Sequence, residues 1–518
     1  MRGVPYHIER SCKWFSAKNC FVHMLSIRKA RVKLICLLTL LLSCPSLAAS
    51  TGALRITVSE IGTSSPLPCR IRLFRIEPQW EQFYYGICPG ILREELPPGR
   101  YMLRVTRGPE YKRVERSVDI FPDETTEVAV SLERITDLAK QGWFSGDTHV
   151  HIEQNLGLNL LAEDLHLAPV ISHNKNQLPK KIRPPEKHVY RTAIDRLYTI
   201  YNWEDELYPE SVIYFNLGTL TDSPPGTKLE NTVDRLLETK RQQPDVWAHI
   251  GVVNLVSVPA LVATGKIDSI EIVSHAFSWW MESDYRQGNP IGGWGVMPDP
   301  KQYPQTFRGR GFFHQDIYYH YLNCGFRIPP TGGTAAGVRN SPLGFCRTYV
   351  HLDGDFTNKA WWDSLAAGRV FVTDGPLLLV KANGKLPGEV FRHKDKTPFQ
   401  AQLDIWVDGN DSIESVQIVR DGKVVESITG KELHGSIESH PLVFNESGWF
   451  LVRAISNVKK NFIFASTGPF YVEIGDQPRP MHREDVRFFL DWIDKYGVGQ
   501  YSSEKARKFY EKLLEQIE

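Results

Sequence analysis

The sequence predicts a mixed α/β protein in which a central domain of alternating strands and helices lies between two β-sandwiches. Short strands with alternating polar positions, separated by glycine and proline, fill residues 51–137 and 377–476. Apolar runs alternate with helical stretches over residues 138–376, as expected of an α/β domain. Ten of the 16 histidines fall between positions 149 and 351, which indicates that the central domain carries the chemistry.

Length and charge limit the classes of function. A chain of 518 residues has room for about three domains, because one domain typically takes ~100–200 residues. The formal net charge is +1, so no basic excess favours binding to nucleic acid. An aromatic content of 11% is typical of a well-packed globular protein.

The first fifty residues (1–50) have the pattern of a secretory signal. Basic residues at 28–33 precede an apolar run at 34–43, and small residues follow at 46–50. The apolar run is too short for a permanent membrane span, and Met24 is a plausible true start. Cleavage near Ala48 is preferred to lipidation of Cys44, because a proline directly after a lipidated cysteine is unusual. We therefore expect an exported protein, periplasmic or extracellular, whose only membrane contact would be a lipid on Cys44.

Four cysteines remain beyond the signal. In an oxidising compartment Cys69–Cys88 and Cys324–Cys346 could each form a disulfide, but spacing alone does not establish the pairing.

In the N-terminal sandwich, Leu54, Ile56 and Val58 alternate with polar residues, and strands are also expected near 71–73, 101–105, 118–120 and 128–132.

The first candidate ligands are His149 and His151, at the end of a short apolar run. Side chains on a strand alternate between faces, so these two imidazoles point the same way and could chelate zinc, manganese or iron. The alternative is a pair of half-buried histidines bonded to backbone.

Later apolar runs end in further polar side chains. These are His173, Asn216, His249 and His275, and an acidic stretch, Glu204–Glu206, precedes the run at 211–216. Reactive residues collect at the carboxyl ends of strands in barrels of parallel strands. The repeated pattern therefore predicts one shared site.

The sequence Gly146-Asp-Thr-His-Val-His151 resembles the opening motif of the PHP (polymerase and histidinol phosphatase) metallohydrolase superfamily. Further stretches resemble its CehA/McbA-like branch: 162–165, 168–174, 214–217, 317–337, 347–354 and 368–376. The resemblance covers residues 142–376. It implies a distorted seven-stranded (β/α) barrel, bound divalent metal, and hydrolysis of ester, carbamate or phosphoester bonds.

Carried over by position, the resemblance implies a set of metal ligands: His149, His151, His173, Glu204 (or its neighbours Asp205 and Glu206), His249 and His275. Glu204 would bridge metals or orient the attacking water. Two departures reduce the expected ion count to one or two. Ser172 stands where the family has Asp, and the turn Gly332–Gly337 lacks the family's last Asp and His.

Two residues near the predicted barrel mouth are candidates for contact with substrate. His320 could reach the site, although bonding to backbone is the simpler interpretation. Arg327 could bind a substrate carboxylate or phosphate bidentately, or form a structural ion pair.

The remaining elements carry no predicted chemistry. A helix is expected at 356–368, ending at Gly368, and strands such as 405–407, 416–419 and 449–455 build the second sandwich. The tail, 477–518, should form two helices whose apolar stripe packs on the chain's own β domain.

The leading prediction is an exported metal-dependent hydrolase acting on a small-molecule or glycan-type substrate through a metal-activated water. The alternative is a decayed hydrolase scaffold that binds ligands or glycans outside the cytoplasm.

Overall fold

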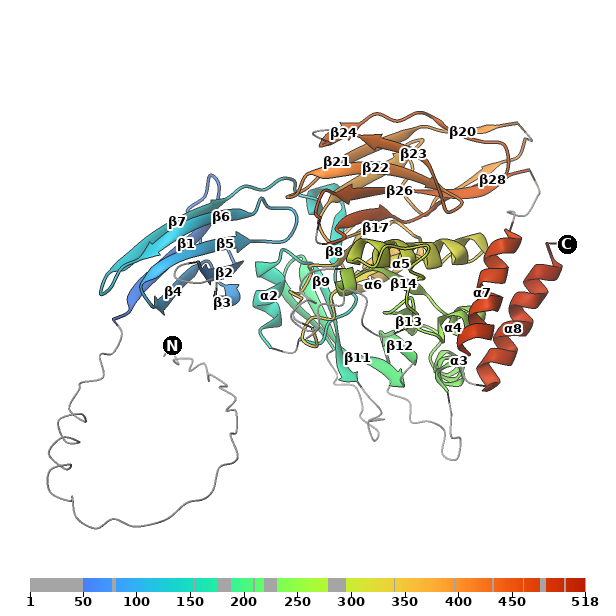
Figure 1. The fold of residues 1–518 in the computed structure, drawn as a ribbon, viewed down its shortest axis with the longest axis horizontal. Coiled ribbons are helices and arrows are strands. Elements are labelled where there is room, and N and C mark those ends of the chain that lie inside the picture. The colour runs from blue at the N-terminus through green and yellow to red at the C-terminus, as the bar shows by residue number, and fades with distance from the viewer. Residues whose placement is uncertain are drawn as a thin grey trace, which may run out of the picture. The chain divides into compact units, whose positions relative to one another are not determined.

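The computed structural model describes residues 50–518, except for 77–80, 153, 175–187, 208–209, 219–230, 278–294, 340, 396, 431–432, 460, 476–480, 498–499 and 518. The predicted signal, with Met24 and Cys44, lies outside the described residues. Within them, no helix is both long and apolar enough to cross a membrane. The described chain is mixed α/β, rich in strands, and contains several sheets (Figure 1).

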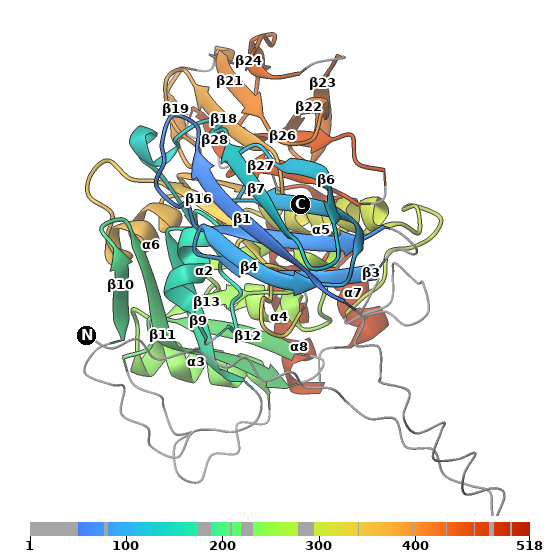
Figure 2. The ribbon, with the colours of Figure 1, turned by 90° about the vertical axis from the view of Figure 1, so that its left-hand side faces the viewer.

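Two facing sheets form the N-terminal region. One has the order β4-β1-β7 and the other the order β3-β2-β5-β6; Figure 2 shows β1 between β4 and β7. The strands are β1 (Gly52–Glu60), β2 (Cys69–Arg75), β3 (Glu81–Cys88), β4 (Ile91–Leu96), β5 (Gly99–Thr106), β6 (Val114–Ile120) and β7 (Thr125–Leu132). Leu54, Ile56 and Val58 are fully buried between the sheets, as their alternation predicted.

The central strands share one direction, with a single reversal among them. They are β8 (Trp143–Gly146), β9 (Leu167–Asn174), β11 (Arg196–Leu207), β12 (Glu210–Phe215), β13 (Trp247–Ile250), β14 (Ser269–Ser274) and β15 (Pro330–Gly333). β8, β9 and β11 are parallel, and so are β13, β14 and β15. β12 is antiparallel to both β11 and β13, so the two parallel sets point the same way. Their carboxyl ends therefore lie at one edge of the sheet. A short strand, β10 (Val189–Ala193), pairs with β11 outside this row.

This row of strands curves back on itself. The Gly332 carbonyl of β15 accepts a hydrogen bond from the Thr148 N–H, just beyond β8, at 3.4 Å. One step further the His151 N–H donates to the Ala336 carbonyl at 2.7 Å. The last strand thus lies beside the first, and inward-facing side chains from distant parts of the chain converge.

The sheet does not stop at the domain boundary expected near residue 376. β16 (Arg347–His351) pairs with β8, and the ladder continues through β17, β27, β26, β22 and β23. The strands of this region are β17 (Val370–Thr373), β18 (Leu377–Ala382), β19 (Val390–His393), β20 (Phe399–Ala401), β21 (Leu403–Asp408), β22 (Ile413–Arg420), β23 (Lys423–Thr429), β24 (Gly435–Ile437), β25 (Leu442–Phe444), β26 (Gly448–Ser456), β27 (Phe464–Thr467) and β28 (Phe470–Ile474). A buried core that includes Val380, Ile405 and Val452 joins the continued sheet to β18-β21-β24.

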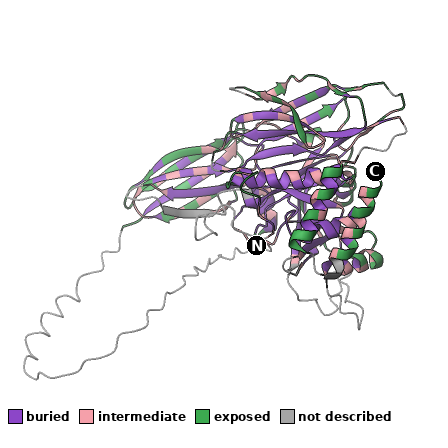
Figure 3. Ribbon diagram, turned by 45° about the vertical axis from the view of Figure 1, so that its right-hand side comes forward, coloured by how far each residue is buried: buried purple, intermediate pink, exposed green. Residues whose placement is uncertain are grey.

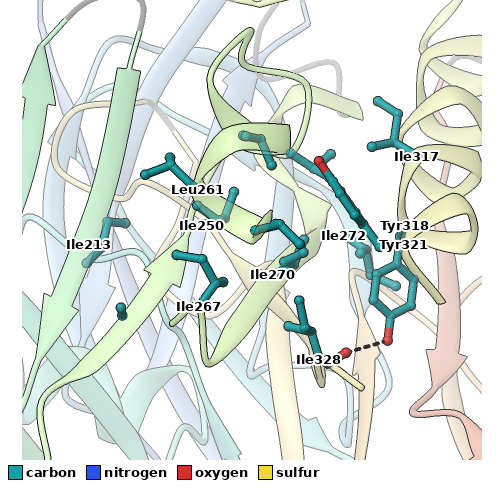
Figure 4. Close-up of a cluster of buried hydrophobic side chains, with 14 of the residues drawn as sticks. Ile213, Ile250, Leu261, Ile267, Ile270, Ile272, Ile317, Tyr318, Tyr321 and Ile328 are labelled. Atoms are coloured by element: carbon teal, nitrogen blue, oxygen red, sulfur yellow. Dashed lines mark hydrogen bonds between the residues drawn. The ribbon is translucent and has the colours of Figure 1, made fainter. Parts of the chain in front are cut away.

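Helices cover the central strands. They are η1 (Ala139–Gln141), α2 (Leu156–Ala162), α3 (Thr232–Gln242), α4 (Val258–Ala263), η2 (His275–Phe277), α5 (Phe307–Asn323), α6 (Asn358–Ala366), α7 (Arg483–Tyr496) and α8 (Gln500–Glu515). Figure 4 shows α5 packing on β14 through Ile317, Tyr318 and Ile272, with the Tyr318 hydroxyl donating to the Ile328 carbonyl at 2.8 Å. The expected helix at 356–368 forms as α6, and Gly368 follows it at φ +73°.

The tail packs differently from the prediction. α7 packs on α5, α8 packs on α4, and the two helices contact each other. Trp492 donates to the Val256 carbonyl at 3.1 Å, and the Tyr510 hydroxyl donates to the Pro259 carbonyl at 3.1 Å. Figure 3 shows buried and exposed faces alternating along these helices. The apolar stripe was read correctly, but a stripe does not say which surface covers it.

Candidate metal centre

His149 and His151 lie just beyond the carboxyl end of β8, on one face of an extended segment. Val150 between them is fully buried in a separate apolar cluster with Leu160 and Val170. Because neighbouring side chains in extended backbone alternate, the two imidazoles point to the other side. Their ring centroids are 5.3 Å apart. The predicted pairing of these two histidines on one face is therefore present in the structure.

Glu204 on β11 completes the first group of candidate ligands. Its Oε2 lies 3.5 Å from His151 Nε2, and its Oε1 lies 4.0 Å from His149 Nε2. One ligand atom from each of the three residues lies within 4.8 Å of the others, so they could hold a metal ion together. The Ser211 hydroxyl donates to Glu204 Oε1 at 3.1 Å and fixes the carboxylate.

The structure also separates Glu204 from its acidic neighbour. Asp205 points to the opposite face, where it forms an ion pair of 2.5 Å with Arg235 on α3. An acidic side chain already neutralised in this way is a poor candidate for a metal ligand. Glu204, whose carboxylate lies beside both histidines, is therefore the member of this stretch that reaches them, and Glu206 lies two positions further along the same face of β11.

Glu271 on β14 is a member of the site that the sequence interpretation missed. Its Oε2 lies 3.2 Å from His149 Nδ1 and 3.9 Å from His249 Nε2. It is 1% exposed. The signal in the sequence was its position between Ile270 and Ile272 in an apolar run, because a strand buried on both faces leaves no exposed position for a carboxylate.

Strand register explains why these groups meet. Glu204 is paired with Ile213, Ile213 with His249, and His249 with Ser269. Paired residues of neighbouring strands point to the same face, and Glu271 follows two positions after Ser269 on that face. The Ser269 hydroxyl lies 2.9 Å from His249 Nδ1 and leaves Nε2 directed toward Glu271.

Burial favours the neutral forms of several side chains in this cluster. It raises the pKa of Glu271 to about 8 and that of Glu204 above its ordinary value. It lowers the pKa of His151 to about 3, with the neighbouring His149 adding to the effect. Glu271 Oε1 and His249 Nε2 have no hydrogen-bond partner among the described residues. Buried donor atoms of this kind, on imidazoles and carboxylates, fit a divalent cation.

The turn Gly332–Gly337, which lacks the expected Asp and His, has a structural role. A Cβ on Gly333 would lie 2.3 Å from Glu271 Oε2, so only glycine leaves this carboxylate in place. Asp147 binds the turn by accepting hydrogen bonds from the Thr334 backbone at 3.1 Å and from its hydroxyl. Ala336 is fully buried.

The remaining residues predicted at strand ends do not all lie at the cluster. His249 and His275 both belong to the cluster region; the His275 ring centroid lies 6.3 Å from that of His149. The backbone of His173 pairs with Trp203, next to Glu204, and its side chain lies outside the described residues. Asn216 is not at this edge, because β12 runs in the opposite direction.

His320 and Arg327 make their contacts elsewhere. His320 Nδ1 is hydrogen-bonded to the Asp485 carboxylate, and its ring stacks on Phe488; both partners are from α7. Arg327 forms an ion pair of 2.5 Å with Glu473 and lies over the Tyr471 ring. The contacts of these two residues therefore lie on α7 and β28, and not at the histidine cluster where a role in substrate contact was predicted. The long helix α5 carries His320 to the tail, and Arg327 faces β28.

Comparisons with known proteins leave the family open. No protein-family model matches the sequence, and no curated protein matches it. Among solved structures, a minor pilin of Streptococcus agalactiae matches at 19% identity over 17% of this chain and 46% of its own, with a TM-score of 0.14. The Bacillus anthracis TIE protein matches at 9% identity over 82% of this chain and 50% of its own, with a TM-score of 0.15. Scores this low carry no argument about fold or function.

Proposed function

We propose that this protein is a metal-dependent hydrolase of the PHP type that cleaves ester, carbamate or phosphoester bonds. The observation that carries the proposal is the convergence of His149 and His151, just after β8, with Glu204 on β11: one ligand atom from each lies within 4.8 Å of the others. Zinc, manganese or iron suits this set of nitrogen and oxygen donors. The curved row of mostly parallel strands, with its polar groups at the carboxyl ends, supports the barrel assignment.

The chain's residues have distinct roles in this proposal. A bound divalent ion would supply a water of lowered pKa and polarise the substrate oxygen. His149 and His151 would hold the ion together with Glu204, whose carboxylate Ser211 orients. Glu271 contacts His149 Nδ1, the nitrogen away from Glu204, and so fixes the orientation of the imidazole. Glu271 Oε2 and His249 Nε2, which lie 3.9 Å apart, offer two further donor atoms beside this group.

The second candidate function is a ligand- or glycan-binding protein on a decayed hydrolase scaffold. One observation favours it. At the turn where the family's last Asp and His are missing, Thr334 bonds to Asp147 and Ala336 is buried, so no polar side chain there replaces the lost ligands. A protein of this kind would bind no stoichiometric metal or would bind it without turnover.

Metal content and turnover, measured together, test the proposal. The metal-free protein is reconstituted with zinc, manganese or iron(II), freed of excess, and assayed on an aryl ester, an aryl carbamate and an aryl phosphate. We expect about one or two ions per chain and metal-dependent hydrolysis of at least one substrate. The double variant His149→Ala/His151→Ala should lose both the bound metal and the hydrolysis.

The matched control removes two histidines outside the cluster, His393→Ala/His440→Ala. His393 contacts the exposed Thr397, and His440 has a side chain that is 93% exposed. This control should keep its metal and activity. Full metal content in the His149/His151 variant would overturn the site, and stoichiometric metal with no turnover on any substrate would favour the binding protein.

Export belongs to the same proposal and rests on the pattern of residues 1–50. The mature protein from the expressing cell should begin near Ala49. A mature chain that begins with a lipid-modified Cys44 would show anchoring, and an intact N-terminus at Met1 or Met24 would contradict export.

A further inference from the structure

The N-terminal sandwich holds two cysteines directly opposite each other. Cys69 is the first residue of β2, Cys88 is the last residue of β3, and the two are paired in the antiparallel ladder. Both are fully buried. Directly opposed residues in such a ladder have Cβ atoms about 4.5–5.5 Å apart, close to the separation that a disulfide bridges.

A second set of contacts holds the same two positions together. Gly90, just after Cys88, takes a φ of +110°, and a Cβ there would lie 2.6 Å from the Leu67 backbone nitrogen. The segment before Cys69 and the turn after Cys88 are therefore packed against each other. The Gly90 carbonyl and Leu67 N–H also bond to the two sides of Val58 on β1. The placement of the cysteines thus depends on more than one hairpin.

We propose that Cys69 and Cys88 form a disulfide when the chain folds in the presence of a disulfide oxidant. This site is independent of the proposed metal centre and lies in a different part of the chain.

The local chemistry favours Cys88 as the sulfur that reacts first. The hydrogen bond from Cys69 lowers the pKa of the Cys88 thiol, and the Gly90 N–H adds a further hydrogen bond at 3.3 Å. The same hydrogen bond, together with burial, raises the pKa of Cys69. One proton is therefore held by Cys69 while the Cys88 thiolate is stabilised, and the thiolate is the nucleophile in exchange.

The reaction balances with a small disulfide such as oxidised glutathione. The Cys88 thiolate attacks one sulfur of the oxidant, which releases one thiolate and leaves a mixed disulfide. Cys69 then loses its proton and attacks the Cys88 sulfur, which releases the second thiolate. Two protein thiols are oxidised, one external disulfide is reduced to two thiols, and the protein loses two hydrogens. Because both sulfurs are buried in the finished fold, the exchange takes place once β2 and β3 have paired and before the sandwich closes over them.

The second candidate pair differs in its surroundings. Cys324 lies beside Tyr321 and Tyr510, at the contact of α5 with α8. Cys346 precedes β16 and lies near Glu271 and Asp147. Neither of these residues lies in a strand of the described chain, whereas the ladder places Cys69 directly opposite Cys88, so the geometry favours the pair Cys69–Cys88.

Peptide mapping of the full chain tests the assignment. The protein is refolded in a mixture of reduced and oxidised glutathione, denatured with N-ethylmaleimide to block thiols, and digested with trypsin without reduction. Cleavage at the arginines places Cys69 in peptide 56–70 and Cys88 in peptide 76–93. We expect these two peptides as one linked species that separates on reduction, with Cys324 and Cys346 carrying the maleimide.

Matched variants give a second readout. Oxidation should raise the unfolding temperature of the wild-type chain and of Cys324→Ser/Cys346→Ser, because the crosslink restricts the unfolded chain. Cys69→Ser/Cys88→Ser should show no such shift. Maleimide on both Cys69 and Cys88 in the wild-type map, or linkage of either to another cysteine, would overturn the proposal without bearing on the metal centre.

Discussion

Asp164 and Glu271 are both acidic, both almost fully buried in the central domain, and differ in what surrounds them. Asp164, between α2 and β9, lies 3.1 Å from Arg107 and 3.1 Å from Arg134, and it also bonds to Arg196. Burial acts to raise its pKa, but the three guanidiniums outweigh burial and hold the pKa below its ordinary range. Here the chain supplies its own cations.

Around Glu271 the chain supplies imidazoles instead. Its contacts are with His149 and His249, and burial raises its pKa to about 8. A buried carboxylate without a counter-charge takes up a proton, whereas one beside a cation stays ionised. The comparison therefore supports the proposal that a cation from outside the protein binds near Glu271, whereas Asp164 already has three guanidiniums around it.

The largest expected effect is a loss of stability when the Asp164 carboxylate is removed. Asp164→Asn leaves three guanidiniums without their shared carboxylate and should lower the free energy of unfolding by ~3–5 kcal/mol. At pH 5, where Glu271 is protonated in the folded chain and only partly ionised in the unfolded chain, Glu271→Gln in metal-free protein should change it by less than about 1 kcal/mol, because glutamine replaces a protonated acid of the same shape. Chemical denaturation of both variants measures the difference. Equal losses would show that the two regions do not differ as described.

The next effect concerns metal affinity. Glu271→Gln should weaken metal binding about 10–100-fold, the usual range for a residue that orients a ligating histidine. Asp205→Asn is the matched control, since Asp205 is acidic and buried but paired with Arg235 on the other face. Calorimetric titration of metal-free protein gives both affinities. The interpretation fails if the Asp205 variant loses as much affinity as the Glu271 variant.

A smaller effect is expected in the pH dependence of metal-free protein. The pKa of Glu271 rises from 4.5 to about 8 on folding, so the folded chain keeps a proton that the unfolded chain has lost. The free energy of unfolding should therefore fall as pH rises toward 8, by at most about 1.4 kcal/mol per unit.

The difference between the wild-type chain and Glu271→Gln from pH 6.5 to 8 isolates Glu271, because Glu110, whose pKa burial raises to about 7, titrates there in both chains. His151, whose pKa falls from 6.5 to about 3 on folding, affects stability below that window with the opposite sign. Asp147, raised to about 6, has largely titrated below it. In Glu271→Gln the decline over this window should flatten. An unchanged slope would mean that Glu271 is ionised in the metal-free fold.

The smallest effect is expected at Arg327. Its ion pair with Glu473 is 43% exposed on the arginine side, and exposed pairs contribute ~0–1 kcal/mol. Arg327→Ala should leave metal content intact and change turnover by less than about twofold, since its contacts lie on β28. A large rise in KM with one substrate would restore its predicted role in substrate binding.

The sequence was sufficient for some parts of the site and not for others. Alternation around Val150 placed His149 and His151 on one face, and the ends of apolar runs pointed to His249 and His275. A local sequence pattern does not reveal the direction of a strand. Asn216, which follows the antiparallel strand β12, was therefore wrongly grouped with these histidines. Which of Glu204 and Asp205 faces inward required the partner Arg235, which lies thirty residues away on α3.

For the fold, too, the sequence predicted the local elements but not their long-range pairing. Period-two alternation identified strands of both sandwiches, because each strand buries one face. It did not reveal that the central sheet continues past residue 376, since sheet continuity depends on long-range pairing such as that of β17 with β27. His320 was placed by nearness in sequence to the predicted mouth, whereas the direction of α5 decides its contacts.

Anomalous X-ray diffraction from crystals of the reconstituted protein, collected at the absorption edge of the bound metal, tests the central claim most directly. The account predicts a peak between His149 Nε2, His151 Nε2 and Glu204, with any second peak beside Glu271 and His249. The described chain offers one other group of potential ligands, His482, Glu484 and Asp485 at the start of α7. A peak there alone, or none at the His149 cluster, would contradict the account.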